Sequence, residues 1–277
     1  MKIRVLLKKY YFKFFEPSVE VYITPKGARW GNLLYFFLRA SIYKEKNKNF
    51  YILYTKHMQD LLTLFPLLKE FVIYEKDVKF YYLKNNSNNY YQRFNQDFTK
   101  KDLDLFIEKY IKTSTEFQMF YNNIPNLENT ISINIRRGDF YEKDNYTIYG
   151  FDQIGFIKHV FDSYLQEKEF KQINIISDDM NWCKNNFQFL ESYCEKIKYP
   201  VFNDNAIHES FSWITKSDSL ILSNSTFSFW GAYISNYLNK SEDKTYCPIF
   251  GSRRIKNTDL YQFNPNWIMI RDFNYSI

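Results

Sequence analysis

The sequence predicts an α/β protein of two domains, and three observations lead to that prediction. The chain has 277 residues, whereas a single domain commonly has ~100 to 200. A hydrophobic fraction of 45%, with 28 Phe and 25 Tyr, supplies enough apolar surface for two cores. Short apolar segments with the period of strands alternate along the chain with segments at helical spacing, which is typical of parallel α/β layouts.

The first domain is predicted to begin with a strand, a turn and a helix. Residues 19–23 alternate as a strand does, and Pro25 and Gly27 mark the turn that follows. From Asn32 onward apolar residues recur at helical spacing, with Arg39 on the more polar side. Further along we expect strands over 50–54 and 71–74, a helix or turn over 61–68, a surface loop over 84–89 and a helix over 103–111.

A polar segment over 122–129, broken by Pro125, is the predicted linker. It separates an N-terminal domain, residues 1–128, from a C-terminal domain, residues 129–277. The last segment of the chain is a candidate to pack back on the N-terminal domain. In the second domain we expect strands over 131–135, 173–176 and 220–222 and a helix over 156–164. Each of these strands ends in a polar cluster, and open parallel sheets bind ligands outside the carboxyl ends of their strands.

The first cluster follows the strand at 131–135 and contains Arg136, Arg137, Gly138 and Asp139. Arg is suited to gripping phosphate with two parallel hydrogen bonds, and a glycine beside it lets the backbone approach a ligand. The residues therefore indicate a phosphate site, although a surface ion pair would use the same residue types.

The second cluster, Ser177, Asp178 and Asp179, follows the strand at 173–176. Two interpretations are open from the residues alone. Ser or Asp caps a helix that begins there, or the adjacent carboxylates hold a divalent ion under a diphosphate.

The third cluster begins after residue 222 and includes Asn224, Ser225 and Thr226. Hydroxyls, backbone N–H groups and a helix N-terminus together form a natural phosphate site. The density of these residues is greater than capping alone requires. We expect the nearby Trp230 to pack in the core rather than to line a nucleotide pocket.

Charge and cysteine content narrow the possible partners. A net charge of +6 favours nucleotide phosphates, anionic lipid headgroups or nucleic acid. The three cysteines form no CxxC pair, which indicates reduced thiols and no metal site. Lysines interrupt the apolar N-terminus well before the ~18 apolar residues of a membrane span, so we expect a cytoplasmic protein without an anchor. Residues 10–15 are a candidate for peripheral contact with the inner membrane face, or else an ordinary edge segment.

Taken in order, the three clusters resemble motifs of glycosyltransferase family 11, which contains bacterial and animal α-1,2-fucosyltransferases. That family carries His-x-Arg-Arg-Gly-Asp-Tyr, then Ser-Asp-Asp with a nearby Trp-Cys, then Asn-Ser-Thr-Phe-Ser-Trp-Trp. The corresponding segments here are 134–140, 177–183 and 224–230. The family's N-terminal Gly-Leu-Gly-Asn-Gln-Met is echoed by 29–34, and its closing Pro-x-x-Trp by 265–267. The resemblance covers about residues 27 to 270.

The resemblance implies a GT-B-like fold, in which two Rossmann-like domains face each other across a cleft. Residues 1–128 would then form the acceptor-side domain and residues 129–277 the GDP-sugar-binding domain. It also implies an inverting, bacterial glycosyltransferase that transfers L-fucose from GDP-β-L-fucose to a galactose hydroxyl, in α-1,2 linkage, on a lipopolysaccharide or capsule glycan. No cofactor or metal is required in this scheme, because a fixed cation replaces Mg²⁺.

The same resemblance assigns roles to individual residues. Arg136 stabilises the leaving diphosphate, and Asp139 is the first candidate for the base that takes the acceptor proton, with Glu142 and Glu209 as alternatives. A dissociative reaction with a diphosphate oxygen as proton acceptor would need no carboxylate. The implied donor-binding residues are Gly31, Asn32, Arg137, Ser177, Asp178, Asn224, Ser225 and Thr226.

The chain also departs from the family pattern. Asn134 stands where the family usually has His, Phe140 replaces Tyr, and Phe229 replaces the first Trp. These changes leave open a different GDP-deoxysugar donor, such as a 6-deoxyheptose or colitose, with the same fold and mechanism. Two other classes use similar residues: a catalytically inactive, lectin-like relative and a nucleic-acid-binding protein. We expect no nucleic-acid partner, because the sequence has no basic stripe or recognised nucleic-acid motif.

Overall fold

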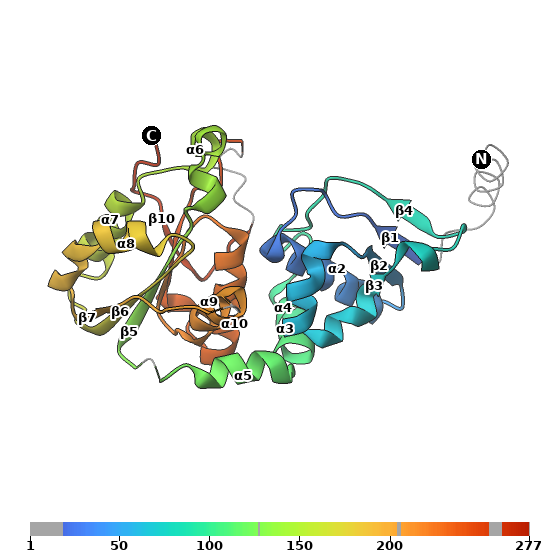
Figure 1. The fold of residues 1–277 in the computed structure, drawn as a ribbon, viewed down its shortest axis with the longest axis horizontal. Coiled ribbons are helices and arrows are strands. Elements are labelled where there is room, and N and C mark those ends of the chain that lie inside the picture. Colours follow the sequence, from blue (N-terminus) through green and yellow to red (C-terminus); the bar gives the residue numbers. More distant parts are fainter. Residues whose placement is uncertain (1–18, 127, 204–205, 255–261, 277) are drawn as a thin grey trace. The chain divides into compact units, whose positions relative to one another are not determined.

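A computed structural model describes residues 19–126, 128–203, 206–254 and 262–276. The chain divides into two compact units, Met1–Glu116 and Phe117–Ile277, here called unit 1 and unit 2 (Figure 1). The division falls within helix α5 (Thr115–Asn123). The domain limits 1–128 and 129–277 stay a prediction. The N-terminal segment 10–15, a candidate for lipid contact, lies outside the described residues.

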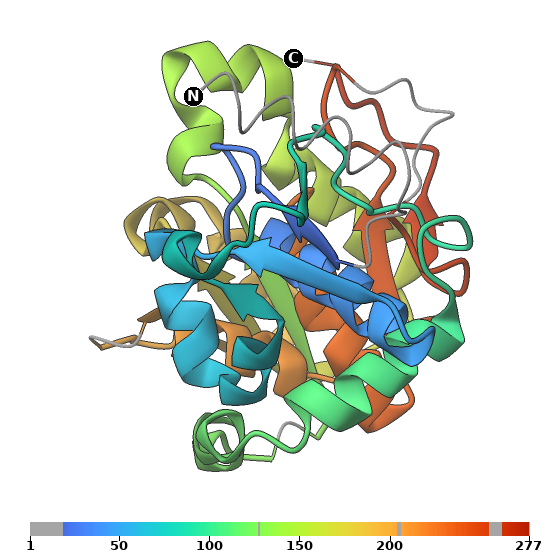
Figure 2. The same ribbon diagram turned by 90° about the vertical axis from the view of Figure 1, so that its right-hand side faces the viewer.

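Unit 1 contains a four-stranded sheet in which every pairing is parallel. Its strands are β1 (Val19–Tyr22), β2 (Asn49–Leu53), β3 (Val72–Ile73) and β4 (Leu83–Asn85). They lie in the order β3-β2-β1-β4, and Figure 2 shows the blue strands β1 and β2 side by side. The chain therefore reverses its direction of growth between β1 and β4, as in the Rossmann strand order.

Two helices of unit 1 show how the local sequence determines burial and helix starts. Helix α2 (Trp30–Glu45) is buried along most of its length because its residues are apolar on nearly all sides. Helix α4 begins at Lys100 because Thr99 and Asp102 form a capping box there. The remaining elements are η1 (Lys56–Met58), α3 (Gln59–Leu64), η2 (Pro66–Phe71), η3 (Glu75–Asp77), α4 (Lys100–Phe106) and the π-helical η4 (Ile107–Ile111).

One expectation for this unit was wrong in part. A surface loop was expected over 84–89, and residues 86–89 form no helix or strand, but Leu83–Asn85 forms the edge strand β4. Its backbone pairs with β1, and Asn85 Nδ2 donates to Glu20 Oε1 at 2.6 Å. Tertiary pairing thus overrides the weak strand propensity of an Asn-rich segment.

Unit 2 contains a six-stranded sheet in the order β10-β9-β8-β5-β6-β7, again with only parallel pairings. Its strands are β5 (Thr130–Ile135), β6 (Phe170–Ser177), β7 (Cys194–Lys198), β8 (Leu220–Ile221), β9 (Thr245–Pro248) and β10 (Ile268–Ile270). In chain order this is the doubly wound arrangement 3-2-1-4-5-6, whose reversal lies between β5 and β8. The predicted α/β class with parallel sheets is confirmed.

Helices cover both faces of this sheet. In Figure 1, α7 and α8 lie on one side of strands β5 and β6, and α9 and α10 lie on the other. The helices and 3-10 turns are η5 (Gly138–Tyr141), α6 (Lys143–Tyr149), α7 (Gln153–Tyr164), α8 (Met180–Asn186), η6 (Gln188–Ser192), α9 (Ala206–Lys216), α10 (Thr226–Asn239) and η7 (Glu242–Lys244). Within the described residues, none of the helices combines the length and hydrophobicity that a membrane span requires.

The alternation of β5 separates an apolar layer from a polar one. Ile131, Ile133 and Ile135 belong to the main apolar cluster, together with residues of α7 and α8. The intervening side chains are polar although they are buried: Ser132 Oγ lies 2.5 Å from Ser217 Oγ. Because buried polar groups need partners, this second layer is held by specific hydrogen bonds rather than by apolar packing alone.

Candidate active site

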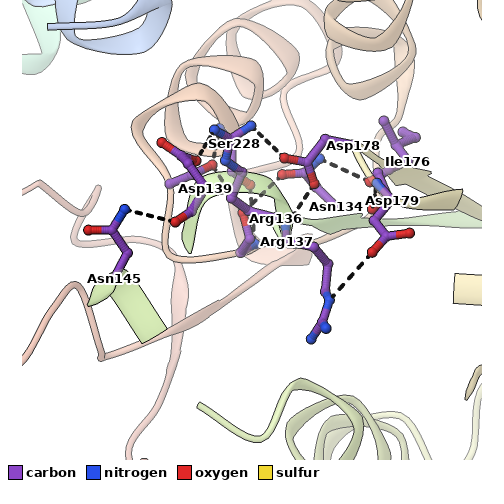
Figure 3. A network of polar contacts seen from close by, with 12 residues as sticks. Asn134, Arg136, Arg137, Asp139, Asn145, Ile176, Asp178, Asp179 and Ser228 are labelled. Carbon is purple, nitrogen blue, oxygen red and sulfur yellow. Dashed lines mark hydrogen bonds and ion pairs between the residues drawn. The ribbon is translucent and has the colours of Figure 1, made fainter. Parts of the chain in front are cut away.

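The three polar clusters lie together at the carboxyl edge of the unit 2 sheet. They follow β8, β5 and β6, which are neighbouring parallel strands, so their carboxyl ends point the same way. The edge includes the reversal between β5 and β8, the position at which doubly wound sheets bind ligands. Figure 3 shows the polar contacts that join the clusters.

Arg136 lies between two carboxylates. Its Nη1 is 2.6 Å from Asp178 Oδ2, and its Nη2 contacts Asp139 Oδ1. Gln153 Nε2 donates to the backbone carbonyl of Arg136 at 3.0 Å, which fixes the backbone beneath the guanidinium. The Arg136 side chain is 34% exposed, so the cation is held in position and is still reachable from solvent.

Gly138 allows this packing because there is no room for a side chain. A Cβ added there would lie 2.5 Å from Asp178 Oδ2 and 3.3 Å from Asp178 Cγ. The glycine therefore permits the close approach of the Asp178 carboxylate to the Arg136 loop, whereas a Cβ there would force that carboxylate to shift. This is the close-approach role of Gly that the sequence suggested, although here the approaching group belongs to the protein.

Arg137 has a different environment from its neighbour. Its guanidinium carbon lies 3.9 Å from the ring centroid of Tyr141 and 3.9 Å from that of Trp182, so it is clamped between two aromatic faces. Its Nε is 4.0 Å from Asp179 Oδ2, and its backbone N–H donates to Asp178 Oδ1 at 2.7 Å. The Arg137 side chain, 18% exposed, links the loops after β5 and β6.

Tyr141, one of the two rings that contact Arg137, is affected by burial. Desolvation raises the pKa of Tyr141 to about 12, against smaller lowering effects of its hydrogen bond to Phe151 O and of nearby Arg137. The phenol therefore stays protonated at neutral pH and donates to the Phe151 carbonyl. Sequence reasoning assigned no role to Tyr141 or Trp182. The spacing of Tyr141 four residues after Arg137 was a faint signal, but the contact with Trp182 is purely tertiary.

In the second cluster, the side chains of Ser177 and Asp179 accept hydrogen bonds from backbone N–H groups of the same segment. Asp179 caps helix α8, where its Oδ1 accepts from Trp182 N at 3.1 Å. Ser177 Oγ accepts from Asp179 N at 2.9 Å. Of the two interpretations left open, the helix cap is confirmed for Asp179. Among the described residues, no group of three or more His, Cys, Asp or Glu side chains could hold a metal ion.

The third cluster forms the start of α10. Ser225 Oγ caps the helix by accepting from Ser228 N at 3.2 Å, and Ser223 Oγ lies 3.0 Å from it. Ser223 Oγ also donates to Asn134 Oδ1 at 3.0 Å. Ser223 and Ser225 are buried, whereas Thr226 is partly exposed. Of these three hydroxyl-bearing side chains, Thr226 is therefore the most accessible to a ligand.

Asn134, which stands where the resembled family has His, links two strand ends. Its Nδ2 donates to Ile176 O at 3.1 Å while its Oδ1 accepts from Ser223. Asn224 has a comparable bridging role, because its Nδ2 donates to Tyr149 O at 2.9 Å and to Gly251 O at 3.1 Å. Both amides thus tie together the loops that surround the carboxyl edge.

Gly31 and Asn32 lie in unit 1, in the first turn of α2. Gly31 is buried, and Asn32 Oδ1 accepts from Gln92 Nε2 at 2.7 Å. Arg29 occupies the N-cap position without a side-chain capping bond. The predicted contact of Gly31 and Asn32 with a donor stays a prediction.

The other candidates are dispersed in the structure. Glu142 is exposed, and Glu209 Oε2 accepts from Asn203 N at 3.2 Å. His208 is buried beside the ring of Phe120. Trp230 is fully buried, as expected of a core residue. The three cysteines are free, and burial raises the pKa of the Cys183 thiol to about 12.

Comparisons with known proteins agree with the motifs. A model of the family described as "Glycosyl transferase family 11" matches residues 45–271, which is most of the chain. An α-1,2-colitosyltransferase of Escherichia coli is 29% identical over 118 residues, 39% of this chain and 37% of that protein. The O-antigen biosynthesis glycosyltransferase WbnK of Escherichia coli is 28% identical over 116 residues, 40% of this chain and 36% of that protein.

The extent of these similarities is limited. The aligned part of the chain spans little more than a third of either curated relative. Among solved structures, a crystal structure of POFUT1 in complex with GDP has a TM-score of 0.47 and 10% sequence identity, over 84% of this chain and 98% of that one.

Proposed function

The chain belongs to glycosyl transferase family 11, and from this premise we propose that it is an inverting glycosyltransferase with a GDP-sugar donor. The proposed reaction transfers L-fucose from GDP-β-L-fucose to a galactose hydroxyl in α-1,2 linkage. The proposal is carried by the position of Arg136. This partly exposed cation lies at the carboxyl edge of a doubly wound sheet, beside the reversal in strand order.

Arg136 is the proposed diphosphate ligand. A guanidinium offers two parallel N–H donors to phosphate oxygens, and these bonds strengthen as negative charge builds on the leaving group. The partly exposed Thr226, at the N-terminus of α10, is a second proposed phosphate contact. In this scheme a fixed cation takes the place of Mg²⁺, so the proposed reaction needs no metal. The carboxylates of Asp178 and Asp179 already have protein partners, which supports that proposal.

Asp139 is the proposed base. As the acceptor oxygen bonds to the anomeric carbon, the bond from that carbon to the β-phosphate oxygen breaks and its electron pair leaves with GDP. The acceptor proton passes to the Asp139 carboxylate, while Arg136 stabilises the departing diphosphate. Attack from the face opposite the diphosphate inverts the anomeric centre. The 49% exposure of the Asp139 side chain is consistent with access to an acceptor.

A second candidate donor is GDP-colitose. It is favoured by the similarity to the protein named an α-1,2-colitosyltransferase. The name of the other relative, an O-antigen biosynthesis glycosyltransferase, supports a surface polysaccharide as the proposed acceptor class. Such an acceptor would be extended at the inner membrane face, which fits the proposed cytoplasmic and peripheral location.

The test is a donor and acceptor panel with the purified full chain. The panel contains GDP-fucose and GDP-colitose with galactose-terminated oligosaccharides, each with and without EDTA, and the readouts are GDP release and product mass. Turnover of GDP-fucose that persists in EDTA is the expected result. Turnover of GDP-colitose alone would replace the donor and keep the mechanism, and activity lost in EDTA would contradict the metal-independent scheme. No turnover of either sugar would contradict the proposed function.

A further inference from the structure

We propose that Asp139 is an internal competitor for the donor diphosphate: it occupies one edge of Arg136 until the donor displaces it, and the displaced carboxylate then becomes available as the base. This inference rests on the proposed function, because it assumes that Arg136 binds a diphosphate. It adds a step that couples donor binding to the release of the base.

The first argument is that both terminal nitrogens of Arg136 are already engaged. Nη1 is 2.6 Å from Asp178 Oδ2, and Nη2 contacts Asp139 Oδ1. A carboxylate oxygen and a phosphate oxygen use the same N–H donors of a guanidinium. The guanidinium has five N–H donors in all, and the proposal is that the diphosphate uses the edge formed by the two terminal nitrogens. Binding at that edge requires one of the two carboxylates to leave.

The second argument is the charge of the cluster. Arg136 and Arg137 face the three carboxylates of Asp139, Asp178 and Asp179. With more negative than positive groups, the ligand-free site is a poor receptor for a diphosphate. Movement of one carboxylate away from Arg136 lowers this repulsion at the same time as it frees the donors.

The third argument is that the two carboxylates are anchored unequally. Asp178 is 28% exposed, accepts from the Arg137 backbone N–H at 2.7 Å and is packed where a Cβ on Gly138 would lie. The Asp139 side chain is 49% exposed, and its ion pair with Arg136 is the contact that the described residues provide for it. Asp139 is therefore the carboxylate that leaves at lower cost.

The local backbone permits this exchange. Asp139 lies in η5, three residues after Arg136, and its carbonyl oxygen accepts from Asn145 Nδ2 at 2.9 Å (Figure 3). With the backbone held at this point, the side chain can rotate away from Arg136 and remain beside the site. The base is then unpaired only when the donor is bound, which ties proton transfer to the presence of the sugar.

The test measures GDP binding by calorimetry in the full chain, without acceptor. Asp139→Asn keeps the size of the side chain and removes the competing charge, and exposed ion pairs are worth about 0.2 to 1 kcal/mol. We therefore expect its Kd for GDP to fall about 1.4- to fivefold. Asp139→Glu keeps a carboxylate in the same loop and should bind GDP as the unmodified chain does.

Two further variants separate competition from general electrostatics and from loss of the site. Asp144→Asn removes an exposed carboxylate from the neighbouring helix α6 and has no contact with Arg136 among the described residues, so its Kd should change little. Arg136→Ala should abolish GDP binding. Thermal unfolding of each variant checks that the fold is kept.

The possible outcomes distinguish this inference from the proposed function. If the unmodified chain binds GDP through Arg136 but Asp139→Asn binds no tighter, the competitor role is wrong and the proposed function stands. An equal gain in Asp144→Asn would assign the effect to net charge and would also overturn the competitor role. If the unmodified chain does not bind GDP at all, the proposed function fails, and this inference fails with it.

Discussion

The two units share a strand order but differ in the chemistry at the edge where that order reverses. Unit 1 has the order β3-β2-β1-β4, and the first four strands of unit 2 in chain order, arranged β7-β6-β5-β8, repeat it. At the unit 1 edge, the first turn of the helix after β1 contains a buried Gly31 and Asn32, whose side chain is hydrogen-bonded to Gln92. At the unit 2 edge, charged residues from neighbouring loops form a network around Arg136.

The shared strand order therefore places a possible binding edge in both units, but the side chains at that edge determine what it can bind. Helix α2 at the unit 1 edge is buried along most of its length, so the residues near its start are under packing constraints. In unit 2, by contrast, the segments after β5 and β6 carry the paired charges of Arg136, Asp139 and Asp178. Substitutions at matched positions in the two units can measure how far the function depends on each edge.

The largest effect is expected for Arg136→Ala. Removal of one preorganised group that stabilises a leaving charge costs ~10²- to 10³-fold in kcat, and the Arg136 side chain is the proposed group of this kind. Steady-state kinetics with GDP-fucose would measure the loss. Arg136→Lys keeps the charge but loses the geometry that donates two parallel hydrogen bonds. Its kcat should lie between those of the unmodified chain and Arg136→Ala. A loss of less than tenfold in Arg136→Ala would show that another group stabilises the diphosphate.

A smaller but still large effect is expected for Gly138→Ala. The new Cβ would lie 2.5 Å from Asp178 Oδ2, so Asp178 or the loop must move, and Arg136 would move with it. Displacement of a catalytic group by ~1 Å can cost about 10²-fold in rate, so we expect kcat to fall by roughly ten- to a hundredfold. The matched control is Gly27→Ala in unit 1, where an added Cβ meets no atom within 4 Å and activity should be unchanged. Equal activity of the two variants would contradict the packing argument.

A moderate loss of stability is expected for Arg137→Ala. The variant removes a cation clamped between Tyr141 and Trp182, and a partly desolvated cation–π contact is worth ~1 to 2 kcal/mol. Denaturant unfolding followed by tryptophan fluorescence would measure the loss of free energy. For comparison, Lys109 in unit 1 lies 5.4 Å from the ring of Tyr110 and is half exposed, so Lys109→Ala should cost less. If Arg137→Ala unfolds at the same denaturant concentration as the unmodified chain, the clamp does not support the fold.

The smallest effect is expected at the unit 1 edge. Asn32→Ala removes the hydrogen bond to Gln92, which is worth about 1 kcal/mol of stability. Gln92→Ala removes the same bond from the other side and is the matched control. If Asn32 also contacts the donor, its variant should raise the donor KM above that of Gln92→Ala. Equal KM values in the two variants would remove Asn32 from the set of donor contacts.

Much of the fold could be predicted because its signals are local. The apolar runs that form β5 and β6 are short, buried and bounded by polar residues, and that pattern is enough to identify buried strands. Strand β7 was not predicted because Cys194–Lys198 carries charged residues and lies at the edge of the sheet. Strands β9 and β10 were missed because Thr245–Pro248 and Ile268–Ile270 are too short for a period to appear.

The parallel α/β class, the three polar clusters at strand ends and the family can all be derived from the amino-acid sequence, because periodicity and motif spacing are properties of contiguous residues. Only the tertiary structure decided which strands are neighbours, since parallel strand order depends on crossover connections between distant segments. The same holds for the environments of the two adjacent arginines. Arg136 is bridged by carboxylates from two loops and Arg137 is clamped by Tyr141 and Trp182, because each environment combines its own loop with the loop after β6, far away in the sequence.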